Sequence, residues 1–212
     1  MNSTSRKVQW TVWGGLALII LTIGVVFLST QIKARISPLP ILGRVTDFHL
    51  TNQLGGVVSL ATLRGKVWVA DIIFTRCPGP CREMTRRMKE LHAALPASER
   101  LKLITLTTDP GFDTPTVLKS YGEQFGAPSD RWWFLTGAKD EIARLAIDGL
   151  KLTALEKTPE VRTNANDLFI HSTYFIVVDQ SGRLRTVIEA MNLGAQKEAV
   201  QAIVGLLGEK NP

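Results

Sequence analysis

The sequence predicts an α/β domain with a mostly parallel sheet, helices on both faces and antiparallel strands at its end. Two observations support this fold class. Short β-branched and apolar runs, such as residues 67–74, alternate with segments of helical apolar spacing, such as residues 81–95. The two cysteines, Cys77 and Cys81, lie where that strand passes into that helix. Open α/β sheets place their functional sites at this position.

An uncharged apolar segment covers residues 10–30 and follows Arg6 and Lys7. A helix of this length spans about 30 Å, the thickness of a bilayer core. We therefore predict a short tail at residues 1–9 and a single transmembrane helix at 10–30. A cleaved signal peptide would have a shorter apolar region that ends in small residues. The flanking charges and the tryptophans of the segment disfavour a helix buried in a soluble core.

Charge and topology restrict the possible functions. The formal net charge is +6, but no basic run is interleaved with aromatic residues, so we do not expect nucleic-acid binding. Basic residues lie on both sides of the apolar segment and do not orient it. One anchor followed by one domain most often places the domain outside the cytoplasm. The N-terminus is not Arg-rich and amphipathic, which favours a bacterial inner membrane over a mitochondrion.

The linker and the elements of the domain follow in order. Residues 31–43 contain two prolines and indicate a linker, so the domain is expected at 44–212. Apolar runs and alternation predict strands at 47–51, 57–60, 67–74, 101–107, 132–135, 172–178 and 184–188. Helical spacing and capping signals predict helices at 81–95, 113–125, 139–146 and 196–207. Residues 152–167 are polar and irregular, and indicate a loop or an insertion.

Cys77 and Cys81 form a C-x-x-x-C pair whose second member lies on the first helical turn. The helix N-terminus stabilises negative charge, so we expect a lowered thiol pKa. Such thiolates can hold a soft metal, or they can cycle between dithiol and disulfide. A disulfide is feasible because the expected Cα separation of about 6 Å lies in the bridged range. Two buried apolar side chains without a function are a weaker alternative, given the prolines of the turn.

Two thiolates alone suffice only for linear Cu(I), so we expect a histidine as third ligand. His171 stands where a loop passes into the strand 172–178, and in a fold of this order that loop can lie beside the cysteine turn. The alternative for His171 is a capping or surface role. His49 and His92 are expected to be exposed to solvent. Among other candidates, we expect Met84 and Met88 to pack in the core, and Asp109 and Asp113 to cap the backbone.

Several motifs together resemble the Sco/SenC family. They are FTRCPGPC at 74–81, TDPGFDTP at 108–115, WFLTG at 133–137, HST at 171–173 and DQSG at 179–182. Members of this family are membrane-anchored copper-handling proteins with a thioredoxin-like mixed sheet flanked by helices, and they serve cytochrome c oxidase assembly. The resemblance implies that Cys77, Cys81 and His171 bind copper, as Cu(I) or Cu(II).

The implied function is delivery of copper to a respiratory oxidase, or maturation of its copper site, by a membrane-tethered protein. The acceptor would be an oxidase subunit or another copper protein, met on the periplasmic side of the bacterial inner membrane. The alternative is a thiol–disulfide oxidoreductase that uses Cys77 and Cys81 to reduce acceptor cysteines. His171 favours copper, because thiol exchange does not need a histidine.

Two residues depart from the family pattern. Family members usually have proline after the second cysteine, where this chain has Arg82, a charge that would alter partner docking. Asp71 interrupts an apolar strand in which Sco proteins more often have an aromatic or apolar residue. Thioredoxins resemble this chain in having a buried acidic residue six positions before the first cysteine. We therefore expect burial to raise the pKa of Asp71 and Asp71 to shuttle protons to the cysteines, unless the backbone or Lys66 satisfies it.

Overall fold

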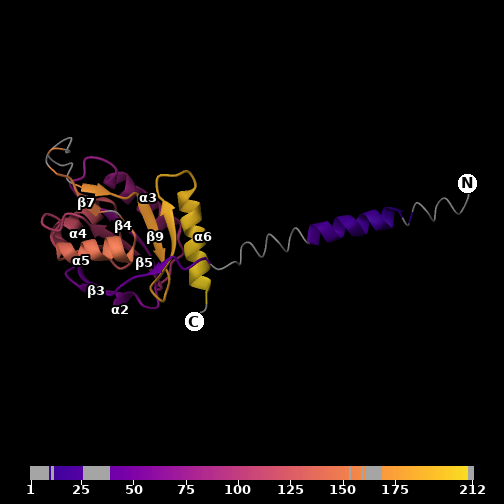
Figure 1. Cartoon of the computed structure of the whole chain (residues 1–212), viewed down its shortest axis with the longest axis horizontal. Helices are drawn as coiled ribbons and strands as arrows, with labels where there is room; N and C mark the ends of the chain where they lie inside the picture. Colours follow the sequence, from indigo (N-terminus) through magenta and orange to yellow (C-terminus); the bar gives the residue numbers. More distant parts are fainter. Residues whose placement is uncertain are drawn as a thin grey trace, which may run out of the picture. The chain divides into compact units, whose positions relative to one another are not determined.

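The structure is a computed structural model that describes residues 10, 12–25, 39–152, 154–158, 160 and 169–209. The chain divides into two units, Met1–Leu39 and Pro40–Pro212. In the first unit, residues 12–25 are helical (Figure 1). Across the described residues, the structure contains no helix that is both long and apolar enough to span a membrane. The predicted tail, the end of the predicted span 10–30 and most of the linker 31–43 lie outside the described residues.

An eight-stranded sheet organises the second unit, with the strand order β1-β10-β9-β4-β5-β6-β2-β3. The strands are β1 (Gly43–Arg44), β2 (His49–Asn52), β3 (Val57–Ser59), β4 (Val67–Ile73), β5 (Leu101–Thr107), β6 (Trp132–Thr136), β9 (Tyr174–Val178) and β10 (Arg183–Glu189). The three central strands β4, β5 and β6 are parallel. The expectation of a mostly parallel sheet was wrong, because antiparallel strands flank both edges. Consecutive strands become parallel neighbours only through a crossover connection, as between β4 and β5 and between β5 and β6. The hairpins β2–β3 and β9–β10, at the two ends of the domain, add antiparallel strands.

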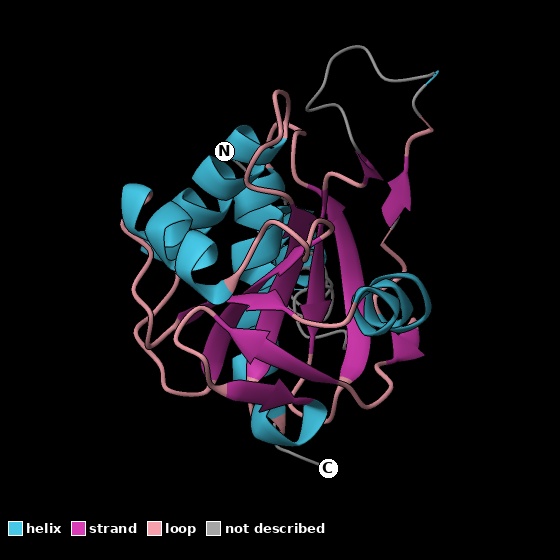
Figure 2. Cartoon of the chain, turned by 90° about the vertical axis from the view of Figure 1, so that its left-hand side faces the viewer, coloured by secondary structure: helices cyan, strands magenta, loops and turns pink. Residues whose placement is uncertain are grey.

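Helices cover both faces of the sheet (Figure 2). On one face, α3 (Cys81–Ala94) and α6 (Ala195–Gly208) pack on each other and on β4, and α4 (Pro115–Gln124) packs on β6. On the other face lie α2 (Leu60–Leu63) and α5 (Lys139–Arg144), which continues as a π-helix, η1 (Leu145–Gly149). The predicted covering of both faces is therefore confirmed.

Most predicted elements agree with the structure within a few residues, the usual uncertainty of element ends. The structure adds β1 and α2, which are too short to leave a periodic signal. It also adds the two-stranded sheet of β7 (Ala154–Glu156) and β8 (Phe169–His171) at the predicted loop 152–167. Their pairing joins segments that are distant in sequence, which local patterns do not specify.

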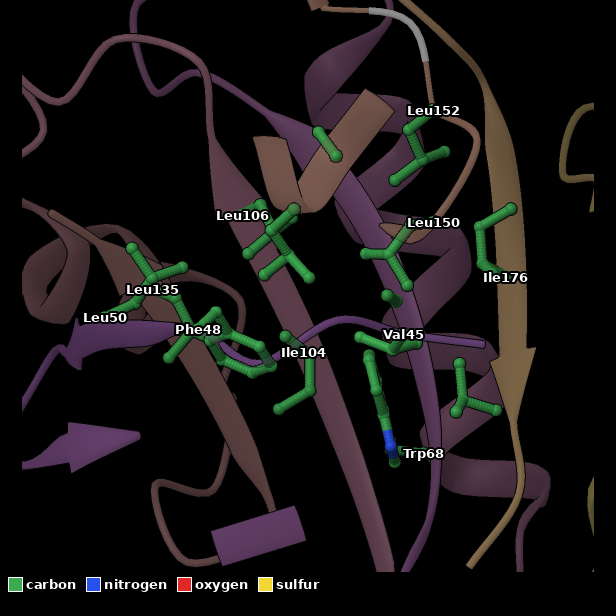
Figure 3. Close-up of a cluster of buried hydrophobic side chains, with 14 of the residues drawn as sticks. Val45, Phe48, Leu50, Trp68, Ile104, Leu106, Leu135, Leu150, Leu152 and Ile176 are labelled. Carbon is green, nitrogen blue, oxygen red and sulfur yellow. The ribbon is translucent and has the colours of Figure 1, made fainter. Parts of the chain in front are cut away.

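The apolar core between the sheet and α5 explains the orientation of β4 (Figure 3). Successive strand residues point to opposite faces. Trp68, Ala70 and Ile72 belong to this core. The intervening residues, including Asp71, therefore face the side of the sheet that is covered by α3, the helix that begins at Cys81.

Candidate functional site

The cysteines lie at the carboxyl end of the central strand, as predicted. β4 ends at Ile73, and α3 begins at Cys81. Between them, the Cys77 N–H donates to the Phe74 carbonyl at 3.2 Å and closes a turn. The Met84 N–H then donates to the Pro80 carbonyl at 2.9 Å, which begins the helix. The sequence thus bends the chain sharply and places both sulfur atoms within one turn.

Neither cysteine is part of a disulfide in the structure, and both are buried. The exposed fraction is 9% for Cys77 and 0% for Cys81. Backbone amides point at the sulfur atoms: Gly79 N–H lies 3.4 Å from Cys77 Sγ, and Phe74 N–H lies 3.5 Å from Cys81 Sγ. The two cysteine side chains also hydrogen-bond to each other.

The pKa of Cys81 is raised, contrary to the expected lowering. Burial is the main cause, and the hydrogen bond and charge of Cys77 add to it. The helix N-terminus does not offset this, because loss of hydration outweighs a partial dipole charge. Cys81 is therefore a protonated thiol in the folded chain.

Asp71 is fully buried on the face of β4 that α3 covers. Burial raises the pKa of both Cys81 and Tyr121, and the negative charge of Asp71 raises both further. Asp71 is therefore close enough to the thiol pair to influence its ionisation. Its role as a proton shuttle stays a prediction.

Tyr121 of α4 supports the first turn of α3, a contact that sequence patterns did not reveal. The Thr85 hydroxyl donates to the Cys81 carbonyl at 3.0 Å and lies 2.9 Å from the Tyr121 hydroxyl. Thr85 has one O–H and already donates it, so Tyr121 is the donor of the second bond. A neutral chain of hydroxyls thus joins α4 to the helix turn that begins at Cys81.

Asp113 is fully buried and does not cap a helix, contrary to expectation. It accepts hydrogen bonds from the Thr75 N–H at 3.1 Å, from the Thr75 hydroxyl and from the Thr107 hydroxyl at 2.5 Å. The cap of α4 is Thr114, which accepts from the Val117 N–H at 3.4 Å. The Asp113 carboxylate instead turns inward, to the ends of β4 and β5. Burial raises its pKa, and the hydrogen bonds from Thr107 and Thr75 oppose this rise.

Asp109 pairs with the arginine that precedes Cys77, which also differs from the capping role we expected. Arg76 Nη2 lies 2.5 Å from Asp109 Oδ2. The Arg76 guanidinium lies 4.1 Å from the centroid of the Phe112 ring. Phe112 itself is 42% exposed. Because both partners come from the loop after β5, that loop contacts the cysteine turn from one side.

The remaining candidates take peripheral or core positions. Arg82 is exposed, and its guanidinium lies 5.6 Å from the centroid of the Phe125 ring. Met84 and Met88 are fully buried, which confirms core packing. His49 is exposed, as expected. His92 lies in the last turn of α3 and is partly buried instead of solvated.

The backbone of His171 ends β8, opposite Ala154. β9 runs antiparallel to β4 with Ile176 opposite Ala70. Extending this register backwards brings the residues before Tyr174 towards the carboxyl end of β4. The side chain of His171 lies outside the described part, and among the side chains described no group of three His, Cys, Asp or Glu could hold a metal ion. Ligation by His171 therefore stays a prediction.

Known proteins resemble this chain across most of the second unit. A family model described as SCO1/SenC matches residues 43–208. The SCO1 protein homolog of Bacillus subtilis is 36% identical over 172 residues, which cover 77% of this chain and 83% of that protein.

Solved structures agree with this relation. BsSco, described as a member of the Sco family of cytochrome c oxidase assembly proteins with a disulfide switch, superposes with a TM-score of 0.70 at 28% identity, over 82% of this chain and 100% of that one. Yeast Sco1 with copper bound gives a TM-score of 0.65 at 27% identity, over 82% of this chain and 92% of that one. The mixed sheet is thus the thioredoxin-like fold of these proteins, and the chain belongs to the SCO1/SenC family.

Proposed function

We propose that this chain binds copper through Cys77, Cys81 and His171 and passes it to a protein acceptor during maturation of a respiratory oxidase. The observation that carries the proposal is the pair of reduced, hydrogen-bonded thiols at the carboxyl end of β4, next to the strand that follows His171. Two thiolates and an imidazole match the preference of copper for soft ligands. Yeast Sco1, solved with copper bound, supports the metal, and BsSco supports the link to oxidase assembly.

Copper would be the cargo of this site. Because Cys81 is protonated in the folded chain, binding would displace its proton. Three protein ligands leave an open position at which an acceptor thiolate can attach. Cys77 is the more exposed of the two thiols, so it is the ligand that an acceptor would replace first.

The segment 10–30 would tether the domain to the bacterial inner membrane, with the domain on the periplasmic side. The helix at 12–25 supports this, since its apolar side chains are exposed and the sequence carries no charge from 10 to 30. A tether would keep the copper site near membrane-bound acceptors and would replace diffusion in three dimensions by a local search.

A second candidate is thiol–disulfide exchange, which the position of Asp71 near Cys81 favours. Cys77 would attack one sulfur of an acceptor disulfide, and Cys81 would resolve the mixed disulfide. Two electrons and two protons then pass to the acceptor, and Cys77 and Cys81 form a disulfide. Asp71 would receive the Cys81 proton and pass it to the leaving thiolate of the acceptor. The test is the rate at which the Asp71→Asn variant reduces an acceptor disulfide across the pH range. If this rate equals that of the wild type, Asp71 does not shuttle a proton.

The copper proposal is tested by titrating the full-length chain with Cu(I) against a competing chelator. His171→Ala is expected to lose at least about tenfold in affinity, or 1.4 kcal/mol. His49→Ala is the matched control, because it removes an exposed imidazole from β2, which lies in the other, eight-stranded sheet. A loss below tenfold for His171→Ala would count against the three-ligand site.

A further inference from the structure

We propose that Asp113 is a positioning residue of the cysteine turn. It holds Thr75, two residues before Cys77, and thereby keeps both sulfur atoms turned towards each other in the reduced protein. This inference rests on the proposed copper function and adds a residue outside the ligand set.

Asp113 connects β4 and β5 just beyond the point where their backbone hydrogen bonds end. The Thr108 N–H donates to the Ile73 carbonyl at 2.9 Å, at the carboxyl ends of β4 and β5. Beyond this hydrogen bond the two segments separate: the one after β4 leads to the cysteines, and the one after β5 leads to α4. Asp113 then bridges them, with the Thr75 N–H at 3.1 Å and the Thr107 hydroxyl at 2.5 Å on the same oxygen, Oδ2.

The bridge is stiff because the carboxylate is buried. Asp113 has no exposed surface, and its three hydrogen bonds come from neutral donors on the two strand ends. A buried carboxylate that loses a donor costs much free energy, since water cannot replace the bond. Thr75 donates through both its backbone and its hydroxyl, so it cannot rotate or shift without breaking one of these bonds.

The position of Thr75 determines that of the thiols. Phe74, the preceding residue, accepts from the Cys77 N–H through its carbonyl and donates to Cys81 Sγ through its own N–H. A displacement of the chain at Thr75 therefore changes the separation and the orientation of both sulfur atoms. Groups that orient metal ligands typically contribute 10- to 100-fold to metal affinity.

Three variants of the full-length chain test this role. Asp113→Ala removes the bridge. Asp113→Asn can keep it, because its amide oxygen can take the place of Oδ2 while its NH₂ donates to the Thr75 hydroxyl, which can also accept. Asp179→Ala is the control for lost stability, since Asp179 is buried and hydrogen-bonded to Arg183 and Arg185 at the other end of β4.

Two quantities are measured: Cu(I) affinity against a chelator, and the reduction potential of the Cys77/Cys81 pair. Asp113→Ala is expected to lower the affinity at least about tenfold and to shift the dithiol–disulfide equilibrium at least about tenfold, or about 30 mV. Asp113→Asn should restore both to within about threefold of wild type, about half of one hydrogen bond's effect. Asp179→Ala should lower stability and leave both unchanged. Wild-type values for Asp113→Ala, or equal shifts for Asp179→Ala, would overturn the proposal.

The two readouts separate this inference from the copper function. If the wild-type chain binds no Cu(I), the copper function fails, while the reduction potential still decides the role of Asp113. If Asp113→Ala does not fold, Thr75→Val takes its place, because it removes the hydroxyl donor and leaves the carboxylate. Thr75→Val is expected to shift the dithiol–disulfide equilibrium about fivefold, and an unchanged potential would refute the positioning role.

Discussion

The two ends of β4 each bury an aspartate next to the strand, and they satisfy it in opposite ways. At the amino end, Asp179 accepts from Arg183 Nε at 2.7 Å and from Arg185 Nη1 at 2.9 Å. Arg185 also pairs with Glu209 at 2.8 Å, after α6. At the carboxyl end, Asp113 accepts from hydroxyls and one amide, and no basic side chain of the described residues bonds to it.

The pKa values of the two aspartates move in opposite directions. Burial acts to raise the pKa of Asp179, but hydrogen bonds from Arg183, Arg185 and Ser181 outweigh it, and the net pKa is lowered. For Asp113, burial prevails and the pKa is raised. The amino end therefore neutralises its charge internally. At the carboxyl end, burial disfavours the charged form of Asp113, and no basic side chain of the described residues offsets it.

The difference between the ends also separates stability from function. Arg185 Nε lies 3.3 Å from the Pro40 carbonyl, so the cluster at the amino end ties the first residues of the domain to the end of α6. Its loss would loosen the domain without reaching the cysteines. The carboxyl end holds a turn in which both thiols must keep one geometry.

The largest effect is expected on stability, when the arginine cluster at the amino end of β4 is disrupted. Arg185→Met leaves Asp179 and Glu209 without their shared partner and should lower the free energy of unfolding by about 3 kcal/mol. Urea unfolding of the full-length chain measures this loss. The Cu(I) affinity, measured by chelator competition on the folded fraction, should stay at the wild-type value. A parallel loss of affinity would show that the two ends are coupled.

A smaller effect is expected in the pH dependence of stability, to which the two aspartates contribute with opposite signs. Asp179, whose folded-state pKa is lowered, contributes stability above its unfolded value of about 3.9 and loses it as pH falls through the folded value. Asp113, whose folded-state pKa is raised, contributes stability that is fully present below about pH 3.9 and is lost as pH rises through the folded value.

Unfolding free energies between pH 3 and 7 check these signs. Relative to wild type, Asp179→Asn should remove stability mainly at neutral pH, and Asp113→Asn should remove it mainly at acid pH. Each variant changes one carboxylate and leaves the other residues of both ends as they are. If both variants gave the same sign of pH dependence, the opposition between the ends would be wrong.

The cysteine site was predictable because its signal is local. Cys77 and Cys81 stand four residues apart, at the junction of a continuous apolar strand and a helix of clear period. Such contiguous patterns survive without knowledge of the rest of the fold. Family membership follows from the same kind of signal, since the motifs of the domain are short and uninterrupted.

The partners of Asp113 and Asp109 were not predictable from local patterns. Thr75 and Asp113 are 38 residues apart, and Arg76 and Asp109 are 33 apart. Both acidic residues stand before a helix, where capping is the default expectation. A signal was present in the threonines at the ends of two apolar strands, because a buried hydroxyl needs a partner.

The sequence alone determined the α/β class, the central strand, the helix after it and the thiol pair between them, because these depend on neighbours in the chain. Tertiary structure decided how strands join at both edges of the sheet, and which buried acid meets arginine and which meets hydroxyls. It also reversed the expected pKa shift of Cys81. The physical reason is burial: the cost of removing a charge or a thiolate from water depends on everything packed around it.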